Sequence, residues 1–184
     1  MKTVAVILAD GLEEVEAITP IDFMRRAGID VVTVALKDLL VKGSHGINLE
    51  ADVPLEEFPR DADALLIPGG MPGSAHIAAD ERVINLVKDF HTHDKLIAAI
   101  CAAPSLVLGT AGVLKDKQYT CYPGFEDKAG PYGDYSGERV VKDGNIITGC
   151  GVGGAAEFSR EVIAALIGED AANQVMKATL QSGY

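Results

Sequence analysis

Short apolar runs alternate with amphipathic segments along most of this chain. The runs are rich in Val, Ile, Leu and Ala, and they predict buried strands at residues 3–9, 29–36, 62–70 and 95–100. Apolar residues at helical spacing predict helices at residues 12–28, 80–93 and 101–108. Apolar strands that alternate with amphipathic helices are typical of a mostly parallel sheet that helices cover on both faces.

Two hairpins interrupt this alternation. A polar piece with two glycines at residues 41–53 predicts a small hairpin. Residues 138–149 predict a second one, with its turn at Asp143-Gly144. Residues 115–137 are rich in Gly, Tyr, Asp and Lys and are expected to be irregular.

The chain ends with two helical patterns, at residues 155–168 and 169–181. With the preceding alternation they predict an α/β fold, a single doubly wound domain over residues 1–184. In such sheets functional groups gather at the carboxyl ends of the strands. The loops to inspect are therefore residues 9–16, 68–74 and 101–104.

The composition predicts an acidic protein without nucleic-acid or membrane partners. The chain is 48% hydrophobic and has a formal net charge of −11, and an acidic surface repels phosphate backbones. The first apolar run is too short to span a bilayer, and Asp10 and the glutamates after it do not resemble a signal-peptide cleavage site. We therefore expect a cytoplasmic protein.

The three cysteines are Cys101, Cys121 and Cys150. An odd number without C-x-x-C spacing argues against a disulfide scaffold or a zinc site. Free thiols are therefore expected.

Cys101 stands where a buried strand stops and a helix with a proline in its first turn begins. This corner resembles a nucleophile elbow, although its flanking residues are alanines instead of glycines. Free amides and the helix dipole at such a position stabilise a thiolate and lower the pKa of the thiol. A packed core cysteine explains the position equally well.

Glu16 lies one turn inside the first helix, after Glu13 and Glu14, which fit its first turn. Its loop leads to the same sheet edge as Cys101. A carboxyl group buried there would have a raised pKa and could donate a proton to a thiolate. A solvated helix charge is the ordinary alternative.

Glycines mark the other loops at this edge. In "PGGMPGS" (68–74) the amide of Gly70 could form an oxyanion hole with the amide of Ala102, although a plain turn explains the loop as well. "GCGVGG" (149–154) matches a dinucleotide motif, but the strand with an acidic residue that should follow is missing. We therefore expect no redox cofactor and assign this loop to backbone packing near the site.

The histidines predict no metal site. His91 and His93 are two residues apart on a helix end and point to different faces. His76 is expected at the surface, and the pattern gives His45 no role.

The stretches "ADGLEEVEAITPIDFMRRAGI", "LLIPGG" and "AAICAAPSLV", in this order and spacing, resemble the ThiJ/PfpI superfamily. The resemblance runs through essentially the whole chain and is greatest to the branch of the parkinsonism-associated protein deglycase. It implies a flavodoxin-like sandwich, a homodimer, Cys101 as nucleophile, Glu16 as its buried partner, and oxyanion amides at Gly70 and Ala102.

The same resemblance implies one of two functions. Some members are cofactor-free glyoxalases or deglycases that act on methylglyoxal, glyoxal and early glycation adducts. Others are oxidative-stress sensors whose cysteine oxidises to a sulfinate, or chaperones. We therefore expect either a cysteine enzyme that acts on small carbonyl compounds, or a sensor or chaperone without significant turnover.

Three positions depart from the family pattern. Ala102 stands where the peptidase branch has a histidine, so protease activity is not expected. Tyr122 in "TCYP" takes the place of a histidine in a "THP" stretch, and a phenol is a poor base at neutral pH. His45 in "GSHG" stands where the branch often has an arginine that reaches the site across the dimer.

Overall fold

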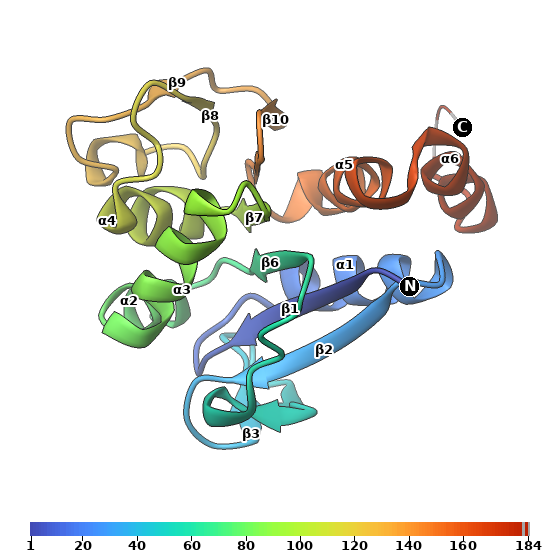
Figure 1. Cartoon of the computed structure of the whole chain (residues 1–184), viewed down its shortest axis with the longest axis horizontal. Helices are drawn as coiled ribbons and strands as arrows, with labels where there is room; N and C mark the ends of the chain where they lie inside the picture. Colours follow the sequence, from blue (N-terminus) through green and yellow to red (C-terminus); the bar gives the residue numbers. More distant parts are fainter. Residues whose placement is uncertain (182, 184) are drawn as a thin grey trace.

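The computed structural model describes residues 1–181 and 183 of the chain. A seven-stranded sheet with the order β10-β11-β7-β6-β1-β2-β5 forms its centre (Figure 1). All neighbouring strands in this sheet are parallel except β10 and β11. Its strands are β1 (Thr3–Leu8), β2 (Asp30–Ala35), β5 (Val53–Pro54), β6 (Ala64–Ile67), β7 (Leu96–Ile100), β10 (Val140–Asp143) and β11 (Ile146–Gly149).

Helices cover both faces of the sheet, as the alternating pattern predicted (Figure 1). One face carries α1 (Glu14–Arg26), α5 (Ala155–Ile167) and α6 (Glu169–Ala178), and the other α2 (Gly73–Ala78), α3 (Glu81–Thr92), the π-helical turn η2 (Pro104–Leu108) and α4 (Gly109–Ala111). Side chains of a strand point alternately to its two faces. Val4 and Val6 of β1 accordingly join the core under α1, and Ala5 and Ile7 join the core under α3.

The strand order confirms the predicted fold class. Without its outermost strands the sheet runs β2-β1-β6-β7-β11, which is the 2-1-3-4-5 order of flavodoxin-like folds. Parallel strands buried on both faces are expected to be continuous apolar runs, as β1, β6 and β7 are. The carboxyl ends of these three strands are neighbours at one edge.

The predicted hairpins are also present. β3 (Leu40–Lys42) and β4 (Asn48–Glu50) form an antiparallel pair, and β10 turns into β11 through Gly144 and Asn145, one residue later than predicted because Asp143 still pairs with Ile146. The segment expected to be irregular contains two short parallel strands, β8 (Gln118–Tyr119) and β9 (Asp134–Tyr135), and the 3-10 turn η3 (Glu126–Lys128). Two further 3-10 turns are η1 (Leu55–Glu57) and η4 (Val152–Gly154).

The pattern does not predict α2 or β5. α2 begins inside the glycine-rich loop expected at residues 68–74, and β5 begins at the last residue of the hairpin expected at residues 41–53. The helix expected at residues 101–108 begins later and is π-helical over Pro104–Leu108. Within the described residues, no helix is long and apolar enough to cross a membrane.

Candidate active site

Cys101 follows β7 directly and has a left-handed backbone, with φ of 65°. Its amide donates to the carbonyl oxygen of Gly149 (2.9 Å), which continues the β7–β11 pairing by one residue. Its own carbonyl oxygen accepts from the amide of Tyr122 (2.8 Å). A non-glycine residue in this conformation costs free energy and persists where its surroundings hold it. The predicted elbow is therefore present, and the thiol is only partly buried.

Glu16 is fully buried, with 0% of its surface exposed, on the first turn of α1. Its amide donates to the side chain of Glu13, the N-cap residue of that helix (2.9 Å). Neither of its carboxyl oxygens has a hydrogen bond of standard geometry to the described residues. A buried, unsatisfied carboxyl group is costly. The alternative of a solvated helix charge is therefore wrong.

Gly69 allows Cys101 and Glu16 to approach each other. A Cβ atom at Gly69 would lie 2.4 Å from Cβ of Cys101 and 2.4 Å from Oε2 of Glu16. No side chain fits between groups this close. The loop after β6 therefore passes directly beside the thiol and the carboxyl group.

The three predicted loops interlock through further backbone contacts. The amide of Glu13 donates to the carbonyl oxygen of Gly69 (3.0 Å). Gly70 has φ of 93°, and a Cβ atom there would lie 2.2 Å from the amide nitrogen of Glu13. A Cβ atom at Gly11 would likewise collide with Pro72, which follows a cis peptide bond. The convergence expected at this sheet edge is confirmed.

The carboxyl group of Glu16 has a raised pKa. Burial raises it to about 7, and the negative charge of Glu13 acts in the same direction. The donor groups nearest to it, the Cys101 thiol and the amides of Gly69 and Val152, lower this pKa in part. Near neutral pH this carboxyl group is therefore present in both protonated and ionised forms.

The expectation of a lowered pKa for Cys101 is wrong. Burial, and then the charge and hydrogen bonding of Glu16, raise the pKa of the thiol to about 12. The amides of Gly70 and Ala102 act in the expected direction and lower it, but by less. The ionisation of each of these two side chains therefore depends on the charge of the other.

The amides of Gly70 and Ala102 both act on the sulfur of Cys101. They come from the loop after β6 and from the residue after the nucleophile, as an oxyanion hole requires. Ala102 itself is buried. Four of the predicted site residues, Cys101, Glu16, Gly70 and Ala102, therefore meet at one place.

Tyr122 and the loop that follows β11 lie beside this group. A Cβ atom at Gly151 would be 3.3 Å from the ring of Tyr122 and 3.6 Å from Oε1 of Glu16. Gly151 has φ of 147°. The "GCGVGG" loop thus lines the site with its backbone, as predicted.

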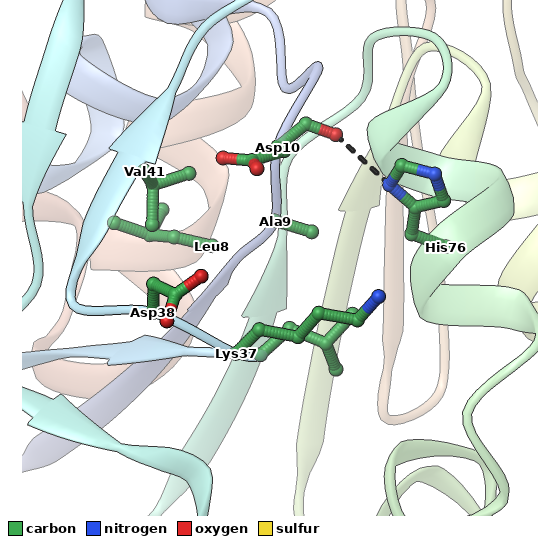
Figure 2. A pocket seen from close by; sticks show the side chains of 8 residues that line it. Leu8, Ala9, Asp10, Lys37, Asp38, Val41 and His76 are labelled. Atoms are coloured by element: carbon green, nitrogen blue, oxygen red, sulfur yellow. Dashed lines mark hydrogen bonds between the residues drawn. The ribbon is translucent and has the colours of Figure 1, made fainter.

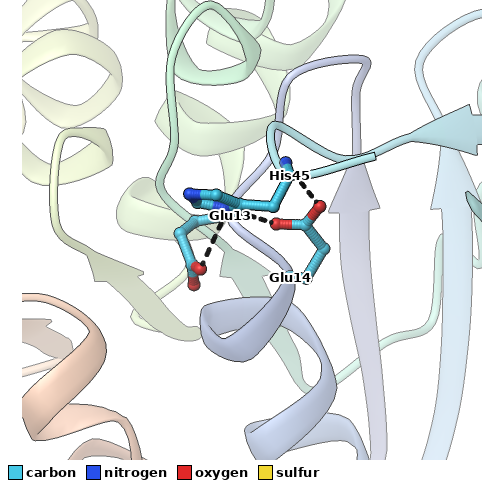
Figure 3. Close-up of side chains that lie close together, drawn as sticks. All are labelled: Glu13, Glu14 and His45. Carbon is cyan, nitrogen blue, oxygen red and sulfur yellow. Dashed lines mark hydrogen bonds and ion pairs between the residues drawn. The ribbon is translucent and has the colours of Figure 1, made fainter. Parts of the chain in front are cut away.

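His45 lies outside this group. Its Nδ1 atom is 2.9 Å from Oε2 of Glu14 and 3.7 Å from Oε1 of Glu13 (Figure 3). The part of the chain that the structure describes shows no hydrogen bond or ion pair between His45 and Cys101 or Glu16. His45 therefore contacts Glu13 and Glu14 at the start of α1, and these residues separate it from the site.

Glu13, Glu14 and His45 bring their ligand atoms within 4.8 Å of one another, which is close enough for a metal ion. Glu14 is already well supplied with donors: its carboxylate accepts from the amides of His45 (2.7 Å) and Ile47 (3.3 Å) and interacts with the His45 ring. Burial raises the pKa of Glu14, but these hydrogen bonds outweigh it and lower the pKa to about 2. The cluster holds the loop between β3 and β4 on α1, which accounts for its geometry without a metal.

A small cavity of about 50 Å³ opens near the same sheet edge, between Asp10, Lys37 and His76 (Figure 2). The exposed ring of His76 contacts the carbonyl oxygen of Asp10 through Nδ1 (3.1 Å). Neither Cys101 nor Glu16 lines this cavity. We therefore do not assign it to the candidate active site.

Sequence reasoning missed Gly69, Glu13 and the amide of Val152 as parts of the site. The first glycine of the "PGG" turn was a usable signal, because a glycine at a strand end often marks a close backbone approach. Glu13 was assigned to the first turn of α1, but its contact with Gly69 depends on how two distant loops pack.

Comparison with known proteins shows which family the chain resembles along its length. Residues 2–165 match the model of the DJ-1/PfpI family. The chain is 38% identical over 179 residues to the Parkinson disease protein 7 homolog of Danio rerio, covering 95% of this chain and 94% of that protein. It is 31% identical over 162 residues to a protein named deglycase from Pyrococcus abyssi, covering 87% and 96%.

Solved structures give the same result. The crystal structure of DJ-1beta from Drosophila melanogaster superposes with a TM-score of 0.93 at 37% identity, over 97% of both chains. Some relatives are longer, and the chain spans 41% of DJ-1 homolog B from Arabidopsis thaliana. Because the chain matches the shorter relatives in sequence, fold and length, it belongs to the DJ-1/PfpI family.

Proposed function

We propose that the chain is a cofactor-independent cysteine enzyme of the glyoxalase or deglycase type. Its substrates would be 2-oxoaldehydes such as methylglyoxal, or early glycation adducts. The observation that supports this most is the arrangement around Cys101, where a buried carboxyl group and two backbone amides surround one thiol. The archaeal relative named deglycase supports the same class of reaction.

The first step is addition of the Cys101 sulfur to the aldehyde carbon, as the ionised carboxyl group of Glu16 takes up the thiol proton. A carbon–sulfur bond forms, and the carbonyl π electrons move onto oxygen. The amides of Gly70 and Ala102 stabilise the developing oxyanion, which then takes up a proton. The proton comes from Glu16, whose pKa of about 7 suits a general acid at neutral pH.

The second step moves a proton between adjacent carbons. Glu16, now ionised, removes the hydrogen from the carbon attached to sulfur and returns a proton to the neighbouring former ketone carbon, while the hydroxyl proton of the hemithioacetal passes to the former ketone oxygen. The first carbon is thereby oxidised to a thioester and the second is reduced to an alcohol, so no external oxidant is needed. Water hydrolyses the thioester, which releases the hydroxy acid and the free thiol.

The test is production of lactate from methylglyoxal by the full chain. We expect turnover by the wild type, none by Cys101→Ser, and about 10²–10⁴-fold less by Glu16→Gln, which cannot move the proton. Circular dichroism and thermal unfolding show that each variant is folded. An inactive wild type, or a Cys101→Ser variant with full activity, would contradict the proposal.

A sensor role is the second candidate. The same pairing of thiol and protonated carboxyl group would stabilise a sulfinate at Cys101 after reaction with peroxide. A structure of the Toxoplasma gondii DJ-1 protein, 33% identical to this chain, is of an oxidised form. Intact mass of the same variants after mild peroxide treatment tests this role. The wild type should gain the mass of two oxygen atoms, and Cys101→Ser should not. A wild type without this gain would rule the role out.

We also infer a homodimer. Val15 and Ile18 expose apolar side chains on α1, and Leu40 and Ile47 do so on β3 and the following loop. Ile18 and Leu49 of β4 line the same groove, so these elements are neighbours. A second copy of the chain would cover this surface.

The three free thiols support a reducing compartment, which for this chain would be the cytoplasm.

A further inference from the structure

The segment of residues 149–154, from the end of β11 to the start of α5, lies against the carboxyl group of Glu16. A Cβ atom at Gly151 would be 3.6 Å from Oε1 of Glu16, and the amide of Val152 is among the donor groups nearest to that carboxyl group. Four of the six residues are glycines, whose backbone has more conformational freedom than that of any other residue. The position of this segment therefore depends on contacts with other parts of the chain.

Arg139, which directly precedes β10, provides contacts near both ends of the segment. Its carbonyl oxygen accepts from the amide of Cys150 (2.9 Å), and Nη2 of its guanidinium group donates to the carbonyl oxygen of Gly153. A Cβ atom at Gly154 would lie 3.3 Å from the carbonyl oxygen of Arg139, so the segment also packs against the backbone of this residue. Both the backbone and the side chain of Arg139 thus hold the segment.

Helix α5 fixes the guanidinium group of Arg139 in turn. Its Nε atom donates to Oε2 of Glu157 (2.7 Å), in the first turn of α5. α5 packs against α1, the helix that carries Glu16. The guanidinium group is planar and holds its donors in fixed directions. It therefore connects the glycine-rich segment to a helix that does not depend on that segment for its own packing against α1.

Movement of the segment would change the surroundings of Glu16 more through burial than through the lost amide. Burial is the largest cause of the raised pKa of Glu16, and the amide of Val152 is a minor one in the opposite direction. The titratable groups that act on Glu16 are Glu13 and Cys101. Charged side chains around Arg139 are those of Glu138, Glu157, Arg160 and Glu161. Water that entered as the segment moved away would therefore lower the pKa of Glu16 towards its ordinary value.

We propose that Arg139 is a positioning residue: it holds residues 149–154 against the carboxyl group of Glu16, keeps water away from that group and so controls the reactivity of Cys101. This inference rests on the proposed function for the roles of Cys101 and Glu16. Among the described residues, Arg139 has no hydrogen bond or ion pair with either of them. An exposed ion pair contributes little to stability, so the arginine is not needed to hold the fold together.

The test measures the rate at which iodoacetamide alkylates Cys101, as a function of pH across the neutral range. The sulfur forms a carbon–sulfur bond, and iodide leaves with its electron pair. Mass spectrometry of the tryptic peptide 96–115, which contains no other cysteine, gives the rate. Because the ionisation of Cys101 depends on the charge of Glu16, the rate should have an inflection at about pH 7. The position of this inflection does not depend on how easily the reagent reaches the sulfur.

Arg139→Ala is expected to move the inflection to lower pH by roughly one unit, because partial loss of burial returns Glu16 part of the way to its ordinary pKa. Arg139→Lys keeps the charge but not the planar group, so it should cause a smaller shift in the same direction. Circular dichroism and thermal unfolding show which variants are folded, and Arg139→Lys carries the test if Arg139→Ala is not.

Arg26→Ala is the matched control. The Arg26 side chain is 52% exposed, against 58% for Arg139, and it forms an ion pair with Asp22 (2.6 Å). Arg26 is the last residue of α1, at the opposite end from Glu16. This variant should leave the inflection where it is in the wild type.

An inflection that the Arg139 variants leave in place, or move to higher pH, would overturn the inference. A wild-type profile that Glu16→Gln does not change would also overturn it, because the inflection would then belong to another group. Lactate production from methylglyoxal is measured in parallel. A shifted inflection without turnover would support the positioning role and contradict the proposed enzymatic function, and turnover without a shift would do the reverse.

Discussion

Gly69 determines, at the scale of a single residue, whether Cys101 and Glu16 can share a proton. A Cβ atom at this position would lie 2.4 Å from Cβ of Cys101 and 2.4 Å from Oε2 of Glu16, so a larger residue would push the two side chains apart. The φ of Gly69 lies outside the left-handed region, so an alanine there would meet a steric conflict and no backbone strain. A substitution at this position therefore tests the close approach of the two side chains without also changing the backbone conformation.

Gly69→Ala is expected to lower turnover of methylglyoxal about a hundredfold, because a displacement of about 1 Å in a catalytic group has an effect of that size. Overpacking should also lower the free energy of unfolding by about 1–3 kcal/mol. Gly153→Ala is the matched control, since its Cβ atom would find its nearest neighbour, in Arg139, at 3.9 Å. Wild-type turnover in Gly69→Ala would show that the close approach is not needed.

The sequence identifies the cysteine of the site but not its protonation. Strand and helix patterns on either side of Cys101 locate the elbow, and a helix start alone would lower the pKa of the thiol. The observed rise depends on burial and on Glu16, which is 85 positions away in the chain and adjacent in space. The pattern of strands and helices places Glu16 at the same sheet edge as Cys101 but leaves a solvated helix charge open, and the resemblance implies the pairing of the two side chains.

At the scale of elements, Glu14 joins the start of α1 to the loop between β3 and β4. Its carboxylate accepts hydrogen bonds from the amides of His45 and Ile47 and interacts with the His45 ring (Figure 3). A Cβ atom at Gly43 would collide with this carboxylate, so the loop wraps closely around it. One ionised group thus holds a helix and a hairpin together.

Protonation of Glu14 should therefore weaken the fold. Its pKa is lowered from 4.5 to about 2, so the stabilisation is complete above about pH 4.5 and is lost as the pH falls towards about 2. Glu14→Gln removes this dependence, and its free energy of unfolding should fall less steeply over that range. Urea denaturation at several pH values measures both slopes.

Glu81→Gln provides the control for Glu14, because Glu81 is an exposed glutamate in the first turn of α3. That variant should keep the wild-type slope between pH 4.5 and 2. If Glu14→Gln and the wild type lost stability in parallel, the carboxylate would not be the group that joins these elements.

Long elements could be predicted from the chain, and so could the short strands of the two hairpins, but α2 and β5 could not. β1, β7 and α3 have enough residues for their period to be recognised. α2 has six residues, and β5 contains only Val53 and Pro54. Elements of this length are decided by the partners they pack against, here the loop at Gly11 and the edge of β2.

At the scale of the whole molecule, the apolar surface on α1 and the β3–β4 hairpin is the feature with most bearing on assembly. Ile18 is 40% exposed, and Val15, Leu40 and Ile47 are also exposed. The formal net charge of −11 opposes nonspecific association. A dimer would therefore depend on specific contacts of this surface and not on nonspecific association.

Ile18→Glu is expected to shift the chain from dimer to monomer, because it places a charge on the proposed contact surface. Ile167→Glu is a close control: Ile167 is 39% exposed, at the end of α5. Light scattering after size-exclusion chromatography measures the mass of each. A wild type that is monomeric, or a dimer that Ile18→Glu leaves intact, would contradict the proposed assembly.

The residues of the site differ in the substitutions that they accept, and this difference has a consequence for how this protein can evolve. Gly11, Gly69 and Gly70 leave no room for a Cβ atom, so nearly every single substitution there would displace the loops that carry Cys101 and Glu16. Tyr122 is half exposed, and its backbone amide donates to the carbonyl oxygen of Cys101. Position 122 can therefore change through a series of folded variants, while the three glycines stay fixed.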